Sequence, residues 1–539
     1  MQRSETFVGS IRNHLMRQAF GFVMFASSLA LVPKEALARV EYHPVLAALY
    51  ANSMNSKNAC LFCHPNKNKR FRNEYGKTLA KQLGGAKRVK DELVVKAAML
   101  AIEKNFPELA AAHANDLRAG HFETHYKPSK VEGELAVEAN YFLWIPEGVT
   151  KLRGIIVHQH GCGDGAEKGG VTASHDLHWQ ALARKWDCAL MGSSYRAKGE
   201  SCRLWCDPRK GSNKTFLRAI DDFVKQSHHK ELTEVPWCLW GHSGGAFWSS
   251  LMQTDFPERI AAIWLRSGTA FGYWEKGEIE KPVIPDAAYQ IPVMCNPGAK
   301  ERDDERFRVA WDGGMDMFKA YRAEGAPIGF APDPNTAHEC GDSRYLAIPF
   351  FDACLAQRLP ESDTASQKLK PVRPNESWLV SPLDTDIAPA GKYEGNPGES
   401  VWLPNESFAK SFLEYSRTGS TTDTTPPPAP YHLSVQKSYR TAPTTLTWQA
   451  EADFESGIRQ FIILKDGVEL LQFPEEPENR FGRPLFQGMS YHDTPVEPLV
   501  EMKIVFPRLE IPAGSKLQVI AVNSVQLKSS PSEPVVVHR

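Results

Sequence analysis

Between residues 129 and 359, short apolar runs alternate with amphipathic segments, and this alternation restricts the fold more than any other feature of the chain. The apolar runs have the length of buried strands, and the segments between them have the spacing of helices. Because parallel strands need such crossovers, the pattern predicts an α/β domain with a mainly parallel sheet and helices on both faces. We expect strands at 154–158, 188–191, 237–240, 261–265, 293–295 and 328–330, and helices at 178–185, 216–226 and 246–252.

Composition divides the rest of this 539-residue chain, which is too long for one hydrophobic core. Residues 39–128 are basic and helical in pattern, which predicts a small helical domain. Residues 360–425 carry scattered prolines and polar residues and predict a linker, with one amphipathic patch at 402–415. Residues 426–539 contain only strand-like runs and predict an all-β sandwich. The formal net charge of −1 argues against a nucleic-acid partner.

Residues 1–38 have the pattern of a secretory signal peptide. A short apolar run at 19–32 is preceded by three arginines, Arg3, Arg12 and Arg17. The small residues of Ala36-Leu37-Ala38 then offer a cleavage site after Ala38. The alternative is an uncleaved membrane anchor. No later stretch is long and apolar enough to span a bilayer, so we expect the body of the protein to be periplasmic or extracellular.

The motif Gly241-His242-Ser243-Gly244-Gly245 directly follows the expected strand at 237–240 and opens the expected helix at 246–252. A serine on such a sharp turn from strand to helix is exposed, and glycines on both sides allow the backbone to crowd together. The motif therefore predicts that Ser243 is a nucleophile. The alternative is a glycine-rich turn with an incidental serine.

A serine nucleophile needs a histidine base and an acid that orients the histidine. Where the serine sits on such a turn in an α/β fold, the chain order is serine, acid, histidine. His338 lies in a loop after the last expected strand and is the predicted base. The candidate acids lie between Ser243 and His338 in the chain, after the expected strand at 293–295: Glu301, with Asp303 and Asp304 as its rivals. Each acid could instead be a solvated charge in a polar loop.

An oxyanion hole needs two backbone amides that point at the developing negative charge. The amide of Gly244 follows the nucleophile and is the first candidate. The second is the amide of Cys162, in the loop after the expected strand at 154–158, with Gly161 and Gly163 as alternatives. A plain turn between strand and helix would have the same composition.

With these motifs, residues 132–360 resemble α/β-hydrolases of the polyhydroxybutyrate-depolymerase and feruloyl-esterase kind. The resemblance implies hydrolysis of carboxylic esters through an acyl-serine intermediate, with a small-molecule or polymer ester as substrate, carbohydrate esters included. The resemblance favours Glu301 as the acid, because it stands three residues after Gly298, where these hydrolases often carry an aspartate. The glutamate at this position is a departure from the usual pattern, as are the cysteines beside the oxyanion loop and His338. Trp205, Arg196 and His175 are candidates to line the substrate pocket, although core or surface positions would suit them equally.

The sequence Cys60-Leu61-Phe62-Cys63-His64 is the attachment motif of c-type haem, with His64 as the iron ligand. Around this motif, residues 40–105 resemble a small cytochrome-c-like domain, which would need a redox partner. The second axial ligand is open between Met99, His113, His121 and His125. A local disulfide or a zinc site are the alternatives, and zinc is disfavoured because no second ligand pair lies nearby.

Eight further cysteines fall into two groups. Cys188, Cys238 and Cys295 lie within apolar runs, which predicts buried thiols. The others lie in or near loops and are candidates for disulfides, with the pairing left open. They are Cys162, Cys202, Cys206, Cys340 and Cys354.

The C-terminal segment resembles a fibronectin type III domain in its proline-rich entry, its strand at Trp448 and its Ala-Val-Asn-Ser stretch ending at Ser524. Trp448 and Phe461 are expected to be core residues. Three whole-protein readings follow: an exported esterase, a haem electron-transfer protein on a non-catalytic hydrolase-like scaffold, or an adhesive exported protein. The first is favoured because nucleophile, base, acid and oxyanion loop occur in the required order.

Overall fold

The computed structural model describes residues 74–84, 94–95, 98–99, 117–197, 202–361, 368–382, 386–437, 443–479, 481–498, 502–507 and 511–538. The chain divides into two compact units, residues 1–116 and 117–539. In the first unit, helix α3 spans Glu74–Gln82. The expected signal peptide and the haem motif Cys60, Cys63 and His64 lie outside the described residues.

The second unit is built on an eight-stranded sheet with the order β1-β2-β4-β3-β5-β6-β7-β8. The last six strands in this order are parallel, and β1 and β2 pair antiparallel at one edge. The bounds are β1 Gly120–Tyr126, β2 Glu138–Ile145, β3 Gly154–Gln159, β4 Cys188–Arg196, β5 Trp237–His242, β6 Ile260–Arg266, β7 Val293–Asn296 and β8 Ile328–Phe330. All six strands predicted from apolar runs are present.

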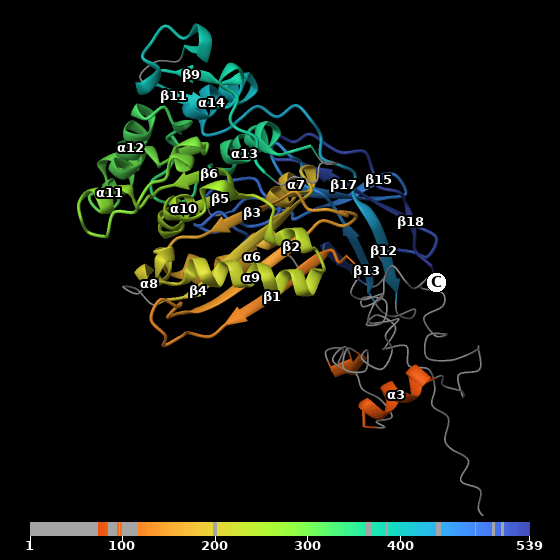
Figure 1. Cartoon of the computed structure of the whole chain (residues 1–539). Coiled ribbons are helices and arrows are strands. Elements are labelled where there is room, and N and C mark those ends of the chain that lie inside the picture. Colours follow the sequence, from red (N-terminus) through yellow and green to blue (C-terminus); the bar gives the residue numbers. More distant parts are fainter. Residues whose placement is uncertain are drawn as a thin grey trace, which may run out of the picture. The chain divides into compact units, whose positions relative to one another are not determined.

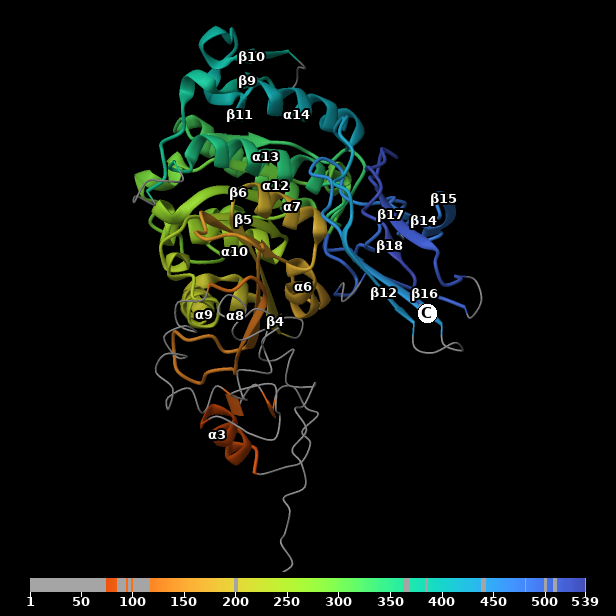
Figure 2. The same cartoon turned by 90° about the vertical axis from the view of Figure 1, so that its right-hand side faces the viewer.

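Helices cover both faces of this sheet (Figures 1 and 2). Helices α7 and α13 pack against one face, and α9, α10 and α12 against the other. Their bounds are α6 Asp164–Ser174, α7 Leu177–Lys185, α9 Ser212–Ser227, α10 Gly244–Asp255, α12 Arg308–Ala323 and α13 Arg344–Arg358. The predicted α/β class, with a mainly parallel sheet and helices on both faces followed by an all-β region, is confirmed.

The predicted helical segment 39–128 extends too far. Strand β1 lies inside it and pairs along its whole length with β2, Gly120 opposite Ile145 and Tyr126 opposite Ala139. Both strands form the sheet's antiparallel edge, where β1 has exposed and half-buried positions in alternation. Such a strand carries polar residues and lacks the continuous apolar run by which the central strands are recognised.

The predicted linker 360–425 is also wrong for most of its length. Strands β9 Trp378–Val380, β10 Ile387–Pro389 and β11 Val401–Leu403 form a small antiparallel sheet, followed by helix α14 Glu406–Thr418. This helix buries Phe408, Phe412 and Tyr415 and contacts α13. The amphipathic patch noted in the sequence is therefore a packed element of the core, whose apolar face stabilises it.

The C-terminal residues form two antiparallel sheets that enclose a separate apolar core. One sheet has the order β12-β13-β16 and the other β15-β14-β17-β18. Trp448 and Phe461 are buried and meet edge to face, as predicted for core residues. The strands are β12 Tyr431–Lys437, β13 Thr444–Gln449, β14 Gln460–Lys465, β15 Val468–Phe473, β16 Met502–Phe506, β17 Lys516–Val522 and β18 Val535–Val536.

The loop between β15 and β16 joins this all-β region to the α/β core through a buried charge network. Arg344 binds Asp493 through Nε at 3.1 Å and Asp176 through Nη2 at 2.6 Å, and Arg483 binds Asp493 at 3.0 Å. All four side chains are buried, and their charges sum to zero. Loss of one partner from a buried pair costs about 3–5 kcal/mol because it leaves a charge unpaired, so the four residues depend on one another at this contact.

Candidate active site

Ser243 occupies the turn between β5 and α10. Its φ of 52° and ψ of −114° lie in a region that non-glycine residues rarely adopt. The turn is held by a hydrogen bond from the Ser243 amide to the carbonyl oxygen of Arg266, at 2.9 Å. A strained residue of this kind persists only where its surroundings over-determine it, and such residues cluster at functional sites.

Two glycines of the motif allow this bend. A Cβ added to Gly241 would collide with the backbone of Gly245, and one added to Gly245 would collide with the carbonyl oxygen of Gln159 on β3. The start of α10 therefore lies directly against the neighbouring strand. Any larger residue at either position would push the helix away from the sheet.

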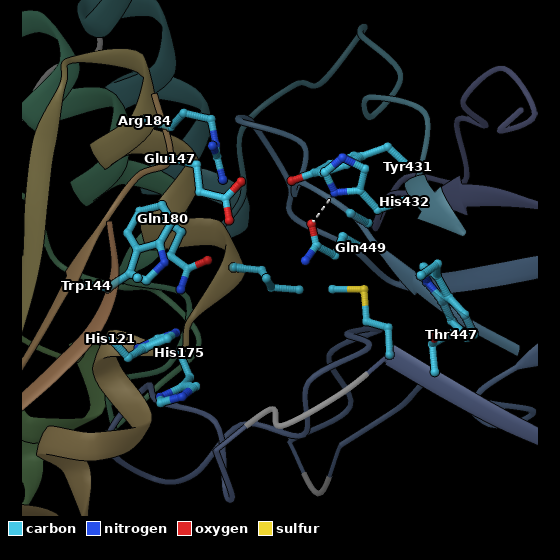
Figure 3. Close-up of a pocket in the computed structure, with 15 residues that line it drawn as sticks. His121, Trp144, Glu147, His175, Gln180, Arg184, Tyr431, His432, Thr447 and Gln449 are labelled. Carbon is cyan, nitrogen blue, oxygen red and sulfur yellow. Dashed lines mark hydrogen bonds between the residues drawn. The ribbon is translucent and has the colours of Figure 1, made fainter. Parts of the chain in front are cut away.

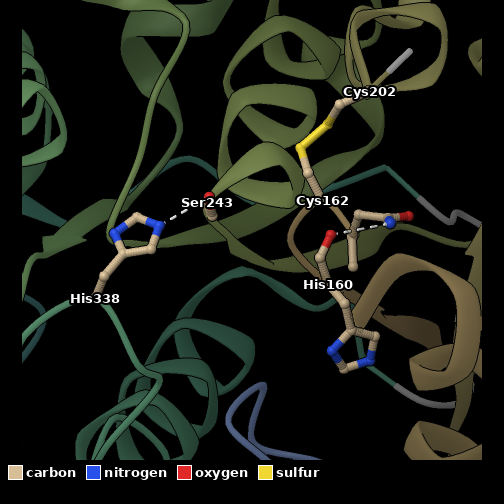
Figure 4. The surroundings of a disulfide bond; sticks show 6 residues. His160, Cys162, Cys202, Ser243 and His338 are labelled. Atoms are coloured by element: carbon tan, nitrogen blue, oxygen red, sulfur yellow. Dashed lines mark hydrogen bonds between the residues drawn. A yellow bond between two sulfur atoms is a disulfide. The ribbon is translucent and has the colours of Figure 1, made fainter. Parts of the chain in front are cut away.

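His338 lies beside Ser243, with its Nε2 atom 2.9 Å from the serine Oγ (Figure 4). Its Nδ1 atom contacts the carboxylate of Glu301. The Glu301 side chain is fully buried, and its other oxygen accepts a hydrogen bond from the amide of Gly298 at 3.1 Å. With its proton on Nδ1, His338 presents a basic nitrogen to the serine hydroxyl.

The rival acids point elsewhere. Asp303 is exposed, and Asp304 accepts hydrogen bonds from the amides of Arg306 and Phe307 at 2.8 and 2.9 Å. Residues Ala299–Asp303 form a single 3-10 turn, so that only the third residue of the turn faces the histidine. The structure thus brings Glu301, and neither rival, to His338.

A buried arginine connects the segments that carry these three residues. The Arg266 guanidinium donates to the carbonyl oxygens of Asn296 at 2.9 Å, Ala337 at 3.0 Å and Glu339 at 3.1 Å. Burial lowers its pKa, but the negative charges of Asp333 and Glu301 outweigh that effect and raise it. The acid loop and the histidine loop are therefore tied to the end of β6 by one permanently charged group.

The two amides predicted for an oxyanion hole lie next to each other. A Cβ placed on Gly244 would lie 3.5 Å from the amide nitrogen of Cys162 and would collide with the Cys162 sulfur. In the part of the chain that is described, neither amide donates to a protein acceptor. Gly163, one of the alternatives, has a φ of 83° and leads into α6.

A disulfide closes this side of the site. It joins Cys162 to Cys202, with 5.7 Å between the Cα atoms. Ser243 lies between His338 and this disulfide (Figure 4). The three thiols predicted to be buried are buried and unpaired. The other disulfide candidates, Cys206, Cys340 and Cys354, are also buried thiols, and burial raises the pKa of each.

Behind Ser243, the buried His242 lies against the half-buried His492, a contact that the motifs did not reveal. His242 Nε2 binds the carbonyl oxygen of His338 at 2.7 Å, and its Nδ1 lies 3.2 Å from Nδ1 of His492. Burial, with the nearby His338, holds the pKa of His242 well below its usual value, so its ring is neutral. His492 comes from the loop between β15 and β16, and no local pattern could have placed it here.

The cavity in front of Ser243 has a volume of ≈ 240 Å³. None of the three predicted lining residues reaches it. Trp205 is buried in a stack against Tyr195, and Arg196 is exposed at the end of β4, where it pairs with Glu138. The residues that line the cavity are Cys162, Cys202, Arg203, Cys206, Ser243, Gly244, Phe247, Ser267, Gly268, Thr269, Tyr273, Arg306, Phe307, Val309, Ala310 and His338.

His175, the third predicted lining residue, borders a different cavity of ≈ 400 Å³. Figure 3 shows Trp144 and Arg184 of the α/β core on one side of this cavity and His432 of the all-β region on the other. The His175 ring stacks on His121 at 3.8 Å. This cavity is separate from Ser243.

The candidates for the second axial ligand of the haem iron are described in part. Met99 is buried, and His125 binds Asn140 at 2.6 Å. His121, at an exposed position of β1, stacks on His175. His113 lies outside the described residues.

No protein-family model and no curated protein matches the sequence. Solved structures that match part of the chain include a thermostable esterase at 14% identity and a TM-score of 0.26, matched over 39% of this chain and 54% of that one, about half its length. An S-formylglutathione hydrolase from Agrobacterium tumefaciens is 13% identical, with a TM-score of 0.31 over 44% and 93% of the two chains. A ferulic acid esterase is 13% identical, with a TM-score of 0.30 over 41% and 92%. Values this low do not bear on what the chain acts on.

The crowding at the turn gives a direct test of this geometry. We expect Gly245→Ala to lower the free energy of unfolding by about 3 kcal/mol, because the added methyl group collides with β3. Gly314→Ala is the matched control, since Gly314 is also a buried helical glycine but has its nearest neighbours at 3.7 Å. The control should be neutral or stabilising by up to about 1 kcal/mol. Equal unfolding midpoints in urea for the two variants would contradict the described turn.

Proposed function

We propose that this protein is an exported serine hydrolase that cleaves carboxylic esters through an acyl-serine intermediate. The observation that supports it most is the chain of contacts from Ser243 Oγ to His338 and from His338 to the buried carboxylate of Glu301. Export is inferred from the N-terminal sequence. Among the described residues, no helix is long and apolar enough to cross a membrane.

In the proposed reaction, Ser243 Oγ attacks the ester carbonyl while His338 Nε2 takes the hydroxyl proton. The oxygen of the tetrahedral intermediate accepts hydrogen bonds from the amides of Gly244 and Cys162. His338 then gives the proton to the departing alcohol, which leaves an acyl-serine. A water molecule, deprotonated by His338, attacks this ester in turn and releases the acid and free Ser243.

Glu301 has a supporting part in both halves of the reaction. Its buried carboxylate keeps the His338 proton on Nδ1 and stabilises the imidazolium that forms when Nε2 takes a second proton. The ring of Phe307 stacks on His338 at 3.8 Å and limits its rotation. The histidine is thus held in one orientation before substrate binds, which lowers the reorganisation needed during the reaction.

Replacing the nucleophile tests the proposal. We expect Ser243→Ala to lower kcat for a 4-nitrophenyl ester by at least about 10³-fold, because the covalent intermediate is lost. Ser267→Ala is the control: this serine lines the same cavity, and its hydroxyl has no hydrogen-bond partner among the described residues. Circular dichroism should show both variants folded. Turnover by Ser243→Ala at the level of the control would refute the assignment.

The acid is tested by two isosteric changes. We expect Glu301→Gln to lower kcat by about 10³- to 10⁴-fold, because an amide favours the wrong tautomer of His338. Asp303→Asn, at an exposed position two residues away, should retain wild-type kcat. Steady-state kinetics of the two purified variants decide the point, and similar losses in both would leave Glu301 without the proposed role.

We further propose that Cys60, Cys63 and His64 bind haem c, on the support of their sequence spacing alone. Protein expressed with cytochrome-c maturation machinery should show a haem absorbance that acid acetone does not extract, because thioether bonds hold the group. Colourless protein would favour a disulfide or zinc instead. Haem-loaded protein without any ester turnover would favour the other proposal, an electron-transfer protein on a hydrolase-like scaffold.

A further inference from the structure

The cavity in front of Ser243 has positive and no negative side chains in its described lining. Its described lining includes two arginines, Arg203 and Arg306, and no aspartate or glutamate. The N-terminus of α10 also points its free amides into this region and adds partial positive charge. A site for a neutral ester needs no such arrangement, because the oxyanion hole alone stabilises the transition state.

Arg203 is held in place by its neighbours. Its guanidinium lies over the ring of Phe247 at 4.7 Å and over that of Tyr273 at 4.3 Å, and both aromatic residues line the cavity. Arg203 directly follows Cys202, whose disulfide binds it covalently to the oxyanion loop. A fixed guanidinium loses little entropy when it binds a ligand, so it is well prepared to bind an anion.

Arg306 lies on the side of the cavity that carries His338. Its guanidinium is 4.8 Å from the centre of the Phe307 ring, which itself stacks on His338. The carboxylate of Asp304, two residues away, accepts hydrogen bonds from the backbone amides of Arg306 and Phe307. Within the part of the chain that is described, neither Arg203 nor Arg306 forms an ion pair, whereas the nearby Arg308 pairs with Asp312 at 3.4 Å.

A neighbouring cavity of ≈ 630 Å³ shares Arg203 but has a mixed charge. Its lining balances the cations Arg203, Arg209 and Lys210 against the anions Asp207, Glu278 and Glu280, and Arg209 already pairs with Asp207 at 2.7 Å. This cavity therefore offers an anion no net attraction. An anion is better accommodated on the Ser243 side of Arg203.

We propose that the ester bound at this site carries a carboxylate close to its scissile carbonyl, and that Arg203, assisted by Arg306, binds that carboxylate. The inference rests on the proposed esterase function and names its substrate class. A guanidinium binds a planar carboxylate through two parallel hydrogen bonds, which gives both attraction and orientation. The negative charge can belong to the acyl part or to the alcohol part of the ester.

Matched ester pairs test this proposal on the full-length protein. For the acyl part, 4-nitrophenyl hemisuccinate is compared with 4-nitrophenyl butyrate. For the alcohol part, 4-acetoxybenzoate is compared with its neutral methyl ester. We expect the wild type to have a higher kcat/KM for the charged member of at least one pair, chiefly through a lower KM, and we expect this preference to fall as salt is added. The pair that shows the preference identifies the part that carries the charge.

Substitutions measure the contribution of each arginine to the preference for charged esters. Arg203→Gln should reduce the ratio of kcat/KM for charged over neutral ester by about 10-fold or more, and Arg203→Lys should restore part of it. Arg306→Gln should reduce the ratio less, because its side chain is exposed. The control Arg308→Gln, outside the cavity, should leave the ratio at its wild-type value.

The outcomes separate the two proposals. Hydrolysis of neutral esters with no preference for charge, or an unchanged ratio in Arg203→Gln, overturns the carboxylate assignment and leaves the esterase proposal standing. Absence of hydrolysis with every ester of both pairs overturns both.

Discussion

The buried guanidinium of Arg266 joins the three segments on which the candidate site depends. The carbonyl oxygen of Arg266 accepts a hydrogen bond from the amide of Ser243. Its guanidinium donates to the carbonyl oxygen of Asn296, at the end of the strand before Glu301, and to that of Ala337, in the loop that carries His338. Five donors in a rigid plane can satisfy several carbonyl oxygens that would otherwise be buried without partners. The positions of nucleophile, base and acid are thereby coupled through one side chain at the end of β6.

The all-β region supports the same loop from the other side. The amide of Cys340, two residues after His338, binds the carbonyl oxygen of Tyr491 at 3.0 Å, and His492 lies against His242. The buried pairs of Arg344 with Asp176 and Asp493 hold this contact in place. In this molecule the C-terminal region is therefore part of the environment of the site, in addition to any separate binding role.

Local pattern was sufficient wherever the structure is determined by local chemistry. The central strands are buried on both faces, so each is a continuous apolar run that can be recognised in isolation. The turn at Ser243 was recognisable because it needs glycines at fixed positions, and crowding around Gly241 and Gly245 explains that need. Strand β1 was missed because an exposed edge strand lacks such a run, and the small sheet at 378–403 was missed because its short strands stand among prolines and polar residues.

By itself, the sequence determined the α/β core, the bend that presents Ser243 and the order in which serine, acid and histidine follow one another. Only the tertiary structure decided that Glu301 and neither aspartate meets His338, that Cys162 pairs with Cys202, and that the loop around His492 lies behind the nucleophile. The reason is physical. Apolar periodicity and glycine conformation act within a few residues, whereas these contacts join residues far apart in the chain and depend on how the whole core packs.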